Sequence, residues 1–250
     1  MVMKKFLILS IIVLTFTAFV TQSFKEEQKK YSRVRQAYSD KETIVKDLLL
    51  SNSIEINYLR IYLRSFKAEK TIELWAKNST DSSYKLIKEY EICQTSGSSG
   101  PKREQGDLQI PEGFYHIDRF NPYSNFFLSL GINYPNRSDR ILGEKGNLGG
   151  DIFIHGSCVT IGCLPITDDR IKELYVFCVE ARNNGQEIIP VTIFPMKPTN
   201  TTYNELISNY ITDKDKLGLW ADLKLGYDHF NATKTLPNIE FLDSGRHRIY

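Results

Sequence analysis

The chain has 250 residues, of which 41% are hydrophobic and 25% charged, a composition typical of a globular protein and unlike that of a disordered or fibrous one. Its formal net charge is +2, and Lys4 and Lys5 are the only charged residues among 1–23, so the rest of the chain is formally neutral. A neutral chain without a basic cluster does not attract nucleic acid, and we exclude nucleic acid as a partner.

Residues 1–23 have the pattern of a targeting segment. A short basic start is followed by Phe6–Val20, which is mostly apolar and shorter than a membrane-spanning helix needs. Small residues for cleavage occur at Thr21–Ser23. We predict a signal peptide here, with an uncleaved N-terminal anchor as the alternative. Either would export the chain to the periplasm or cell envelope, and the chain would contact the membrane only through this segment.

Residues 24–52 are rich in charged side chains, with apolar residues at helical spacing, and predict a helical lead-in. From Ser53 the apolar residues alternate instead, which is typical of strands, and residues 53–198 form the predicted catalytic domain. The strands are expected at 54–63, 71–75, 84–92, 114–117, 151–154 and 186–194.

Two helices are expected in the second half of the chain. One begins at Thr167, where Thr167 or Asp168 can cap it. The other spans 206–230, within a C-terminal helical extension over 199–250 that packs on the domain. Many short strands with few helices predict a β-rich α+β domain.

The four cysteines are Cys93, Cys158, Cys163 and Cys178. An even number in an exported protein suggests disulfides, although a chain of this length can fold without them. Cys158 could pair with Cys163, pack in the core, or bridge to Cys93 or Cys178, and we favour packing or one of the last two bridges. A free cysteine in an oxidising compartment is a liability, so a free Cys163 is easiest to understand as a functional thiol.

The segment Ile154–Pro165 contains the groups that cysteine chemistry needs. A thiol nucleophile requires a nearby base and backbone N–H donors for the oxyanion. His155 ends an apolar strand, and the amides of Gly162 and Cys163 are candidate oxyanion donors. Spacing alone is a weak indication, because a core histidine beside a buried cysteine explains it equally well.

Further ordered motifs resemble the YkuD-type L,D-transpeptidases. Their active-site pattern is H-G, a variable stretch, then [ST]-H-G-C, and it is matched by His155-Gly156 and by Thr160-x-Gly162-Cys163. The YafK-like subgroup is the most similar, and the resemblance covers roughly 55–235. The other matching motifs are Ser96-Gly97, Gly100-Pro101-Lys102, Glu104-x-Gly106-Asp107, Ile110-Pro111-Glu112-Gly113-Phe114-Tyr115, Tyr134-Pro135-Asn136, Trp220, Gly226-Tyr227 and Phe230.

The resemblance implies a mostly β catalytic domain that acts on peptidoglycan stem peptides without a cofactor. Cys163 would be the nucleophile that forms an acyl-enzyme, and His155 the base. The Gly156 carbonyl or Ser157 would orient the imidazole. An amine would resolve the acyl-enzyme in a transpeptidase. Water would resolve it in a YafK-like amidase, which hydrolyses the link between a cell-wall-attached protein or peptide and diaminopimelate. A third reading is a non-catalytic peptidoglycan-binding module.

Two positions depart from the family pattern. The histidine that commonly precedes Gly-Cys is Ile161, and the basic residue that often follows the cysteine by two is Pro165. A missing arginine removes a carboxylate contact, so we expect the substrate to be presented differently.

Substrate contacts are predicted from Thr160 and from a turn after an aromatic run. Tyr134, Asn136 and Arg137 could line the groove there, with a plain turn as the alternative. No metal site is predicted, because a zinc site built from the His155 to Cys163 segment lacks an evident fourth ligand. His116 is expected to be structural, and His229 and His247 are expected at the surface.

Overall fold

The computed structural model describes residues 22–250. The predicted signal peptide or anchor concerns residues 1–23 and therefore lies almost wholly outside this range. Within 22–250, no helix combines the length and the apolar character needed to cross a membrane.

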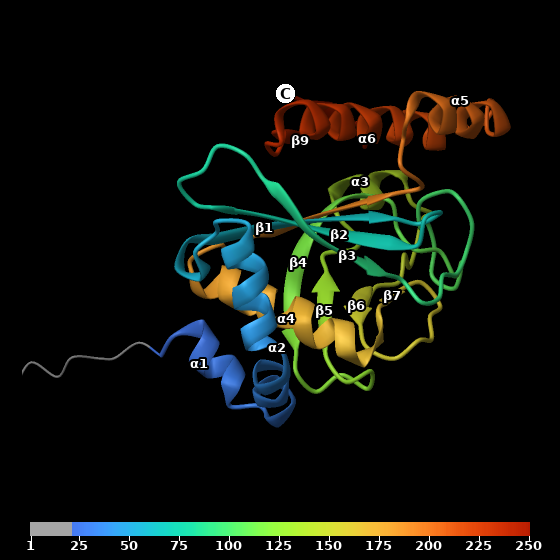
Figure 1. Ribbon diagram of the computed structural model, residues 1–250. Coiled ribbons are helices and arrows are strands. Elements are labelled where there is room, and N and C mark those ends of the chain that lie inside the picture. The colour runs from blue at the N-terminus through green and yellow to red at the C-terminus, as the bar shows by residue number, and fades with distance from the viewer. Residues whose placement is uncertain (1–21) are drawn as a thin grey trace, which may run out of the picture.

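The centre of the fold is a curled mixed sheet with strand order β3-β2-β1-β8-β4-β5-β6-β7 (Figure 1). Two pairs, β1 with β8 and β6 with β7, are parallel, and the other neighbours are antiparallel. The predicted β-rich α+β class is confirmed. The strands are β1 (Leu59–Phe66), β2 (Thr71–Asn78), β3 (Lys85–Glu91), β4 (Gly113–Asn121), β5 (Ser129–Ile132), β6 (Phe153–His155), β7 (Leu164–Pro165) and β8 (Ile189–Phe194).

Strand β1 explains why helices cover both faces of the sheet. Leu59, Ile61 and Leu63 point into the main core, as their alternation predicts. Tyr62 and Phe66, on the other parity, belong to two separate apolar clusters on the opposite face. A strand buried on both sides needs a layer of structure on each side.

The predicted strand at 54–58 is absent, which corrects the sequence analysis. Ile56–Tyr58 forms a short 3-10 turn, and the strand begins at Leu59. Leu59 pairs with Asn78, the last residue of β2. Residues before it therefore have no partner strand for their backbone groups, and extended backbone without a partner is unfavourable.

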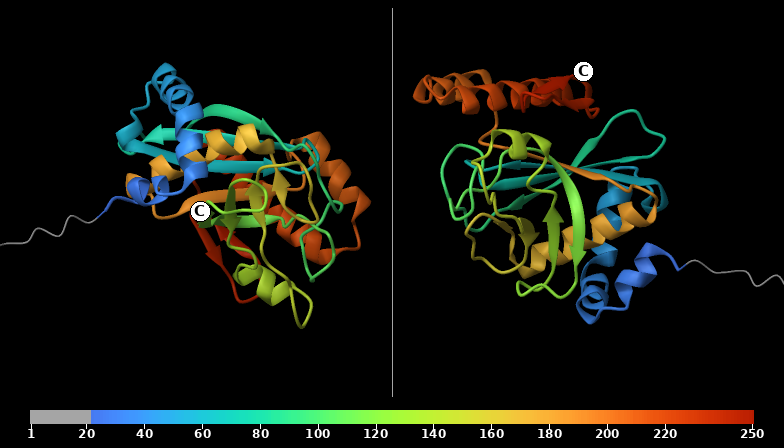
Figure 2. Two further views of the ribbon diagram at one scale, coloured as in Figure 1. Left: turned by 90° about the horizontal axis from the view of Figure 1, so that it is seen from below. Right: turned by 180° about the vertical axis from the view of Figure 1, so that it is seen from behind.

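One face of the sheet is covered by α1 (Phe24–Lys29), α2 (Ser32–Ser51) and α4 (Thr167–Asn183) (Figures 1 and 2). The helix predicted to begin at Thr167 is present. The apolar side of α2 packs into the main core together with α4. The residues of α2 that do so are Val34, Ala37, Tyr38, Val45 and Leu49.

The other face is covered by α5 (Asn200–Asn209) and α6 (Lys214–Thr233). The single helix predicted over 206–230 is therefore two helices. The chain turns between them because Asp213 accepts a hydrogen bond from the Lys216 amide and starts a new helix.

The chain ends in a hairpin of β9 (Ile239–Phe241) and β10 (His247–Ile249) against α6. This hairpin corrects the prediction that His247 lies at the surface. His247 is 6% exposed, its ring lies between those of Phe114 and Phe241, and Asp222 accepts its backbone N–H at 2.8 Å. The hairpin folds back onto α6 and so buries a residue near the end of the chain. His229, by contrast, is partly buried.

Candidate active site

The strands β6 and β7 bring His155 and Cys163 together. His155 is the last residue of β6, and Cys163 directly precedes β7, which runs parallel to β6. Because the two strands are parallel, the loop between them runs back from the end of β6 to the start of β7. Both side chains line one pocket of about 240 Å³. The lining residues are Asn121, Ser124, Asn125, Phe126, Ser129, Asp151, Phe153, His155 and Cys163.

The imidazole of His155 is held in one orientation. Nδ1 lies 2.5 Å from the carbonyl oxygen of Gly156, which can only accept, so Nδ1 carries the proton and Nε2 has a free lone pair. The ring stacks on Phe126 with 4.5 Å between ring centroids. Burial lowers the pKa of His155 below its usual value of 6.5, although the bond to Gly156 opposes this. The histidine is therefore a neutral base at pH 7.

Gly156 is required by the close packing around it. A Cβ at this position would collide with the Asp168 carboxylate and the Phe126 carbonyl. Asp168 Oδ1 accepts the Ser157 N–H at 2.7 Å. The predicted cap of α4 by Thr167 or Asp168 is not formed, because no side chain caps this helix. Ser157 is exposed, and the contact that orients the imidazole comes from Gly156.

Cys163 carries a free thiol. Its Sγ donates to the carbonyl of Asp151 over 3.5 Å. Burial raises the pKa of the Cys163 thiol above its usual value of 9.0, and the negative charge of Asp151 adds to the shift. At neutral pH the site therefore holds a neutral thiol and a neutral imidazole. Within residues 22–250, Sγ makes no hydrogen bond to the imidazole, so the thiol must turn toward His155 before proton transfer.

Thr160 organises the loop that carries the nucleophile. Its hydroxyl oxygen accepts the amides of Gly162 at 3.1 Å and Cys163 at 2.8 Å, and it donates to the Cys163 carbonyl at 2.8 Å. The two amides predicted as oxyanion donors are therefore occupied in this conformation. Thr160, which is also predicted as a substrate contact, bonds to its own loop in this conformation.

A disulfide joins Cys93 to Cys158, with 5.8 Å between their Cα atoms. It ties the loop after β3 to the loop that precedes Cys163. Of the pairings left open by the sequence, the bridge to Cys93 is the one present. The remaining cysteine, Cys178, is a fully buried thiol in α4. Because Cys158 is bridged, it cannot supply a thiolate ligand to a metal.

The predicted turn residues lie elsewhere. The Tyr134 hydroxyl donates to backbone carbonyls, Asn136 caps α3 (Arg137–Leu142), and Arg137 pairs with Asp243. These three residues are not among those that line the pocket within the described chain. The pocket wall comes instead from residues 121–126, which the sequence analysis did not single out. The local signal for this segment is the aromatic run, including Phe126 and Phe127, that precedes the turn at Tyr134.

Two lining residues of the pocket, Asp151 and Phe153, contact a charged side chain outside it, and the loop before Cys163 carries exposed apolar groups. Arg119 Nη1 lies 3.0 Å from the exposed carboxylate of Asp151, and its guanidinium lies over the Phe153 ring at 4.8 Å. On the catalytic loop, Val159 is 51% exposed and Ile161 is 78% exposed. Ile161 is one of the positions that depart from the family pattern, so an apolar surface replaces an expected polar one beside the nucleophile.

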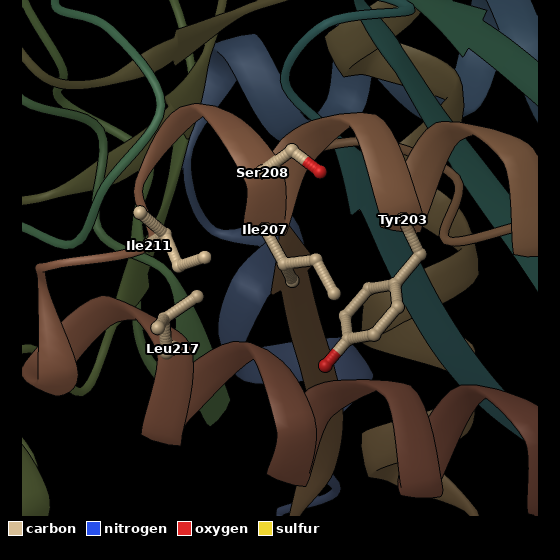
Figure 3. A pocket seen from close by; sticks show the side chains of 5 residues that line it. All are labelled: Tyr203, Ile207, Ser208, Ile211 and Leu217. Carbon is tan, nitrogen blue, oxygen red and sulfur yellow. The ribbon is translucent and has the colours of Figure 1, made fainter.

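A second hollow lies between α5 and α6 (Figure 3). Its wall is mostly apolar, with Tyr203 and Ser208 as the polar side chains. Neither has a base or a charged partner among the residues that line this hollow. The lining residues are Tyr203, Ile207, Ser208, Ile211 and Leu217. The chemistry-bearing groups are in the pocket of Cys163, and we take that pocket as the candidate active site.

The chain is similar to known proteins over more than half of its length. The model of the YkuD family, the L,D-transpeptidase catalytic domain, matches residues 57–193. A protein from Escherichia coli described as "Putative L,D-transpeptidase YafK" is 36% identical over 191 residues, which cover 76% of this chain and 73% of the relative.

Two solved structures are also similar. The helical cell shape determining protein Pgp2 from Campylobacter jejuni is 20% identical, covers 79% of this chain and 80% of its own, and has a TM-score of 0.41. Bd1075 from Bdellovibrio bacteriovorus is 22% identical, covers 61% of this chain and 55% of its own, and has a TM-score of 0.38.

Proposed function

We propose a function from one premise: this chain belongs to the YkuD-type L,D-transpeptidase family. The proposed reaction is cysteine-dependent acyl transfer on peptidoglycan stem peptides through an acyl-enzyme on Cys163. The observation that carries the proposal is the pocket in which Cys163 and a tautomerically defined His155 meet. A nucleophile, a base with a free lone pair and a group that orients the base are the parts that nucleophilic catalysis requires.

The protonation states determine how the reaction starts. The thiol and the imidazole are both neutral, so Nε2 of His155 takes the thiol proton as Sγ attacks the substrate carbonyl carbon. The C–N bond then breaks, and the imidazolium gives its proton to the leaving amine. An incoming amine or water attacks the thioester, passes its proton to Nε2, and releases the acyl group as sulfur takes the proton back.

The charges at the pocket mouth support a substrate that carries both an amine and a carboxylate. Asp151 and Arg119 are paired and exposed, so each can exchange its partner for an oppositely charged group of a ligand. Diaminopimelate side chains in stem peptides present both groups. This pair would supply the carboxylate contact that the family motif lacks here.

The test is covalent labelling of Cys163. After incubation with purified tetrapeptide-containing muropeptides, the intact protein should gain the mass of the acyl group, and the Cys163→Ala variant should not. Cys178→Ala is the matched control, because it removes the other free thiol and should still be acylated. Turnover of muropeptides by Cys163→Ala would refute the proposal, and a folded wild type that is never acylated would favour the binding module.

The exposed Val159 and Ile161 favour a second candidate, an amidase that releases a protein or peptide from diaminopimelate. An apolar surface beside the nucleophile suits an apolar segment of a bound protein better than a small polar acceptor. Incubation with sacculi separates the two reactions. New cross-linked muropeptides indicate transfer, whereas released protein or peptide with no new cross-links indicates hydrolysis.

A further inference from the structure

Arg33, near the start of α2, reaches the wall of the candidate active site. Its Nη1 donates to the carbonyl of Ser124 at 2.5 Å and to that of Phe127 at 2.8 Å. The guanidinium also lies over the Phe127 ring, 5.7 Å from its centroid. One side chain thus joins two carbonyls that are three residues apart from each other. Both lie more than 90 positions after Arg33 in the sequence.

The segment between these two carbonyls contains Phe126, whose ring stacks on His155. Phe127 has a φ of +69°, a conformation that a phenylalanine rarely adopts without support from its surroundings. The Phe126 carbonyl also packs against Gly156, where a Cβ would not fit. The turn that carries Phe126 is therefore bonded to Arg33 of α2 on one side and packs against Gly156, just after the end of β6, on the other.

We infer that Arg33 is a positioning residue for the proposed reaction, and that it fixes residues 124–127 so that Phe126 keeps the imidazole of His155 in place. The inference rests on the proposed function for the reaction it serves. Arg33 contacts neither His155 nor Cys163 and acts only through Phe126. A second contact, in which the Tyr31 ring meets that of Tyr123 at 5.0 Å, places the same end of α2 against the same loop.

The consequence of losing Arg33 follows from the exposure of Phe126. The Phe126 side chain is 38% exposed, so it has room to move away once the two carbonyls lose their shared donor. Water would then reach the imidazole. The charged groups around it are Asp168, behind Gly156, and Asp151, across the pocket. The Gly156 carbonyl would still accept from Nδ1, so the imidazole would keep its tautomer. Without the stacked Phe126 ring, the imidazole would be less restricted in its orientation.

The test compares Arg33→Ala with Arg35→Ala. Arg35 lies on the same helix, and its Nη1 also donates to two carbonyls, those of Lys29 and Lys30, which are not among the residues that line the pocket. We expect kcat/KM for muropeptides to fall roughly tenfold to a hundredfold in Arg33→Ala, as for a base displaced by about 1 Å. The NMR titration midpoint of His155, assigned with His155→Gln, should rise toward the ordinary value. Arg35→Ala should change neither quantity.

A double-mutant cycle gives an independent check. Phe126→Leu removes the stacked ring but leaves the carbonyls that Arg33 holds. If Arg33 acts through Phe126, the effects of Arg33→Ala and Phe126→Leu on kcat/KM are non-additive, because the second change finds the contact already lost. Additive effects would overturn the inference, and so would an Arg33→Ala protein that matches Arg35→Ala.

Two further measurements separate positioning from simple loss of fold. Arg33→Lys keeps one donor group and should recover part of the lost kcat/KM; a lysine variant that folds but is as impaired as alanine would count against the inference. The NMR titration needs no turnover. If the wild type has no activity on muropeptides, the proposed function fails, but an unchanged His155 midpoint in Arg33→Ala would separately refute the role of Arg33.

Discussion

The two helical layers differ in how they relate to the pocket of His155 and Cys163. The N-terminal layer, α1 and α2, shares one apolar core with the sheet and α4, and Arg33 extends from it to the pocket wall. The C-terminal layer, α5 and α6, has its own apolar clusters on the other face and supplies none of the residues that line the pocket within the described chain. The first layer contacts the wall of the candidate site, and the second supports the sheet.

The contacts that hold the layers also differ. The α2 helix is held by apolar side chains, by a buried hydrogen bond from the Tyr38 hydroxyl to Glu180, and by ion pairs such as Lys172–Asp40 at its edge. The C-terminal layer combines its apolar clusters with charged groups that are bonded inside the protein. Trp220 Nε1 donates to Glu112, and Arg246 pairs with the buried Asp222. Buried polar contacts are costly to break, since the remaining partner is left without a hydrogen bond.

The largest effect is expected at Trp220, which is 1% exposed. Trp220→Ala should lower the free energy of unfolding by about 4 kcal/mol, because it leaves a large cavity and removes a donor to Glu112. Urea unfolding measures the loss, and Trp220→Phe, which keeps an aromatic ring, should cost less. If the C-terminal layer supports only the sheet, the kcat of the folded Trp220→Ala protein should stay near that of the wild type. A fall as large as that in Arg33→Ala would show that this layer also affects the pocket.

Removal of the disulfide tests whether the catalytic loop depends on support from outside both layers. The bridge closes a span of 65 residues, and replacing Cys93 and Cys158 with serine should cost about 3 kcal/mol of stability. The rate at which iodoacetamide labels Cys163 should also change, because the loop loses its attachment. A thiol reductant should reproduce both effects in the wild type and have no effect on the double variant. If labelling is unchanged, the helical layer alone is enough to hold the loop.

A smaller, pH-dependent effect is expected at Asp222. Burial alone would raise the pKa of this carboxyl, but bonds from Arg246 and His247 outweigh it and lower the pKa to about 2. Because the pKa of Asp222 is lower in the folded state, its ionised carboxylate stabilises the fold at pH values above the unfolded pKa of 3.8. This stabilisation is lost as the pH falls through about 2. Asp222→Asn should therefore cost about 2 kcal/mol at pH 7, and the difference should shrink toward acid pH.

The matched control is Asp228→Asn, because Asp228 is exposed and, within residues 22–250, forms its ion pair with Lys224 on the same helix. It should change stability by less than about 0.5 kcal/mol at either pH. Chemical denaturation at pH 7 and pH 3 checks both variants. Equal losses at the two pH values would show that the C-terminal layer is not held by the charge of Asp222.

The smallest expected effect is the change of kcat/KM with pH near neutrality. Burial lowers the pKa of His155 and raises that of the Cys163 thiol, so the reactive pair is neutral from below pH 6.5 to above pH 9. We expect kcat/KM to fall only below pH 6.5, as His155 is protonated, and to stay level up to about pH 9. A rate that rises steadily between pH 7 and pH 9 would instead indicate that the thiolate is the reacting form.

The parts of the fold that follow from local pattern could be predicted from the sequence. The alternation of Leu59, Ile61 and Leu63 predicts a strand because side chains alternate between the faces of a sheet. The expectation that His155 lies near Cys163 came from the order of motifs, and the pairing of β6 with β7 is what brings them together. The split between α5 and α6 was missed because the apolar spacing continues through the turn at Asp213.

The supporting contacts of the site could not be predicted, because they join residues with no local relationship. Arg33 and Phe127 are 94 positions apart, and nothing in the pattern around either residue indicates the contact. His247, which is expected at the surface, is buried. Its burial depends on a short hairpin packing onto α6, which is a property of the tertiary structure.

The Thr160 hydroxyl occupies the two amides that an oxyanion would need. A substrate carbonyl therefore has to compete with an internal ligand before it can bind there. A neutral carbonyl is about as good an acceptor as a hydroxyl and gains little from the exchange, whereas a negatively charged oxygen forms the stronger bond. The loop would thus be selective by competition: it would release its amides to the tetrahedral intermediate and withhold them from the ground state.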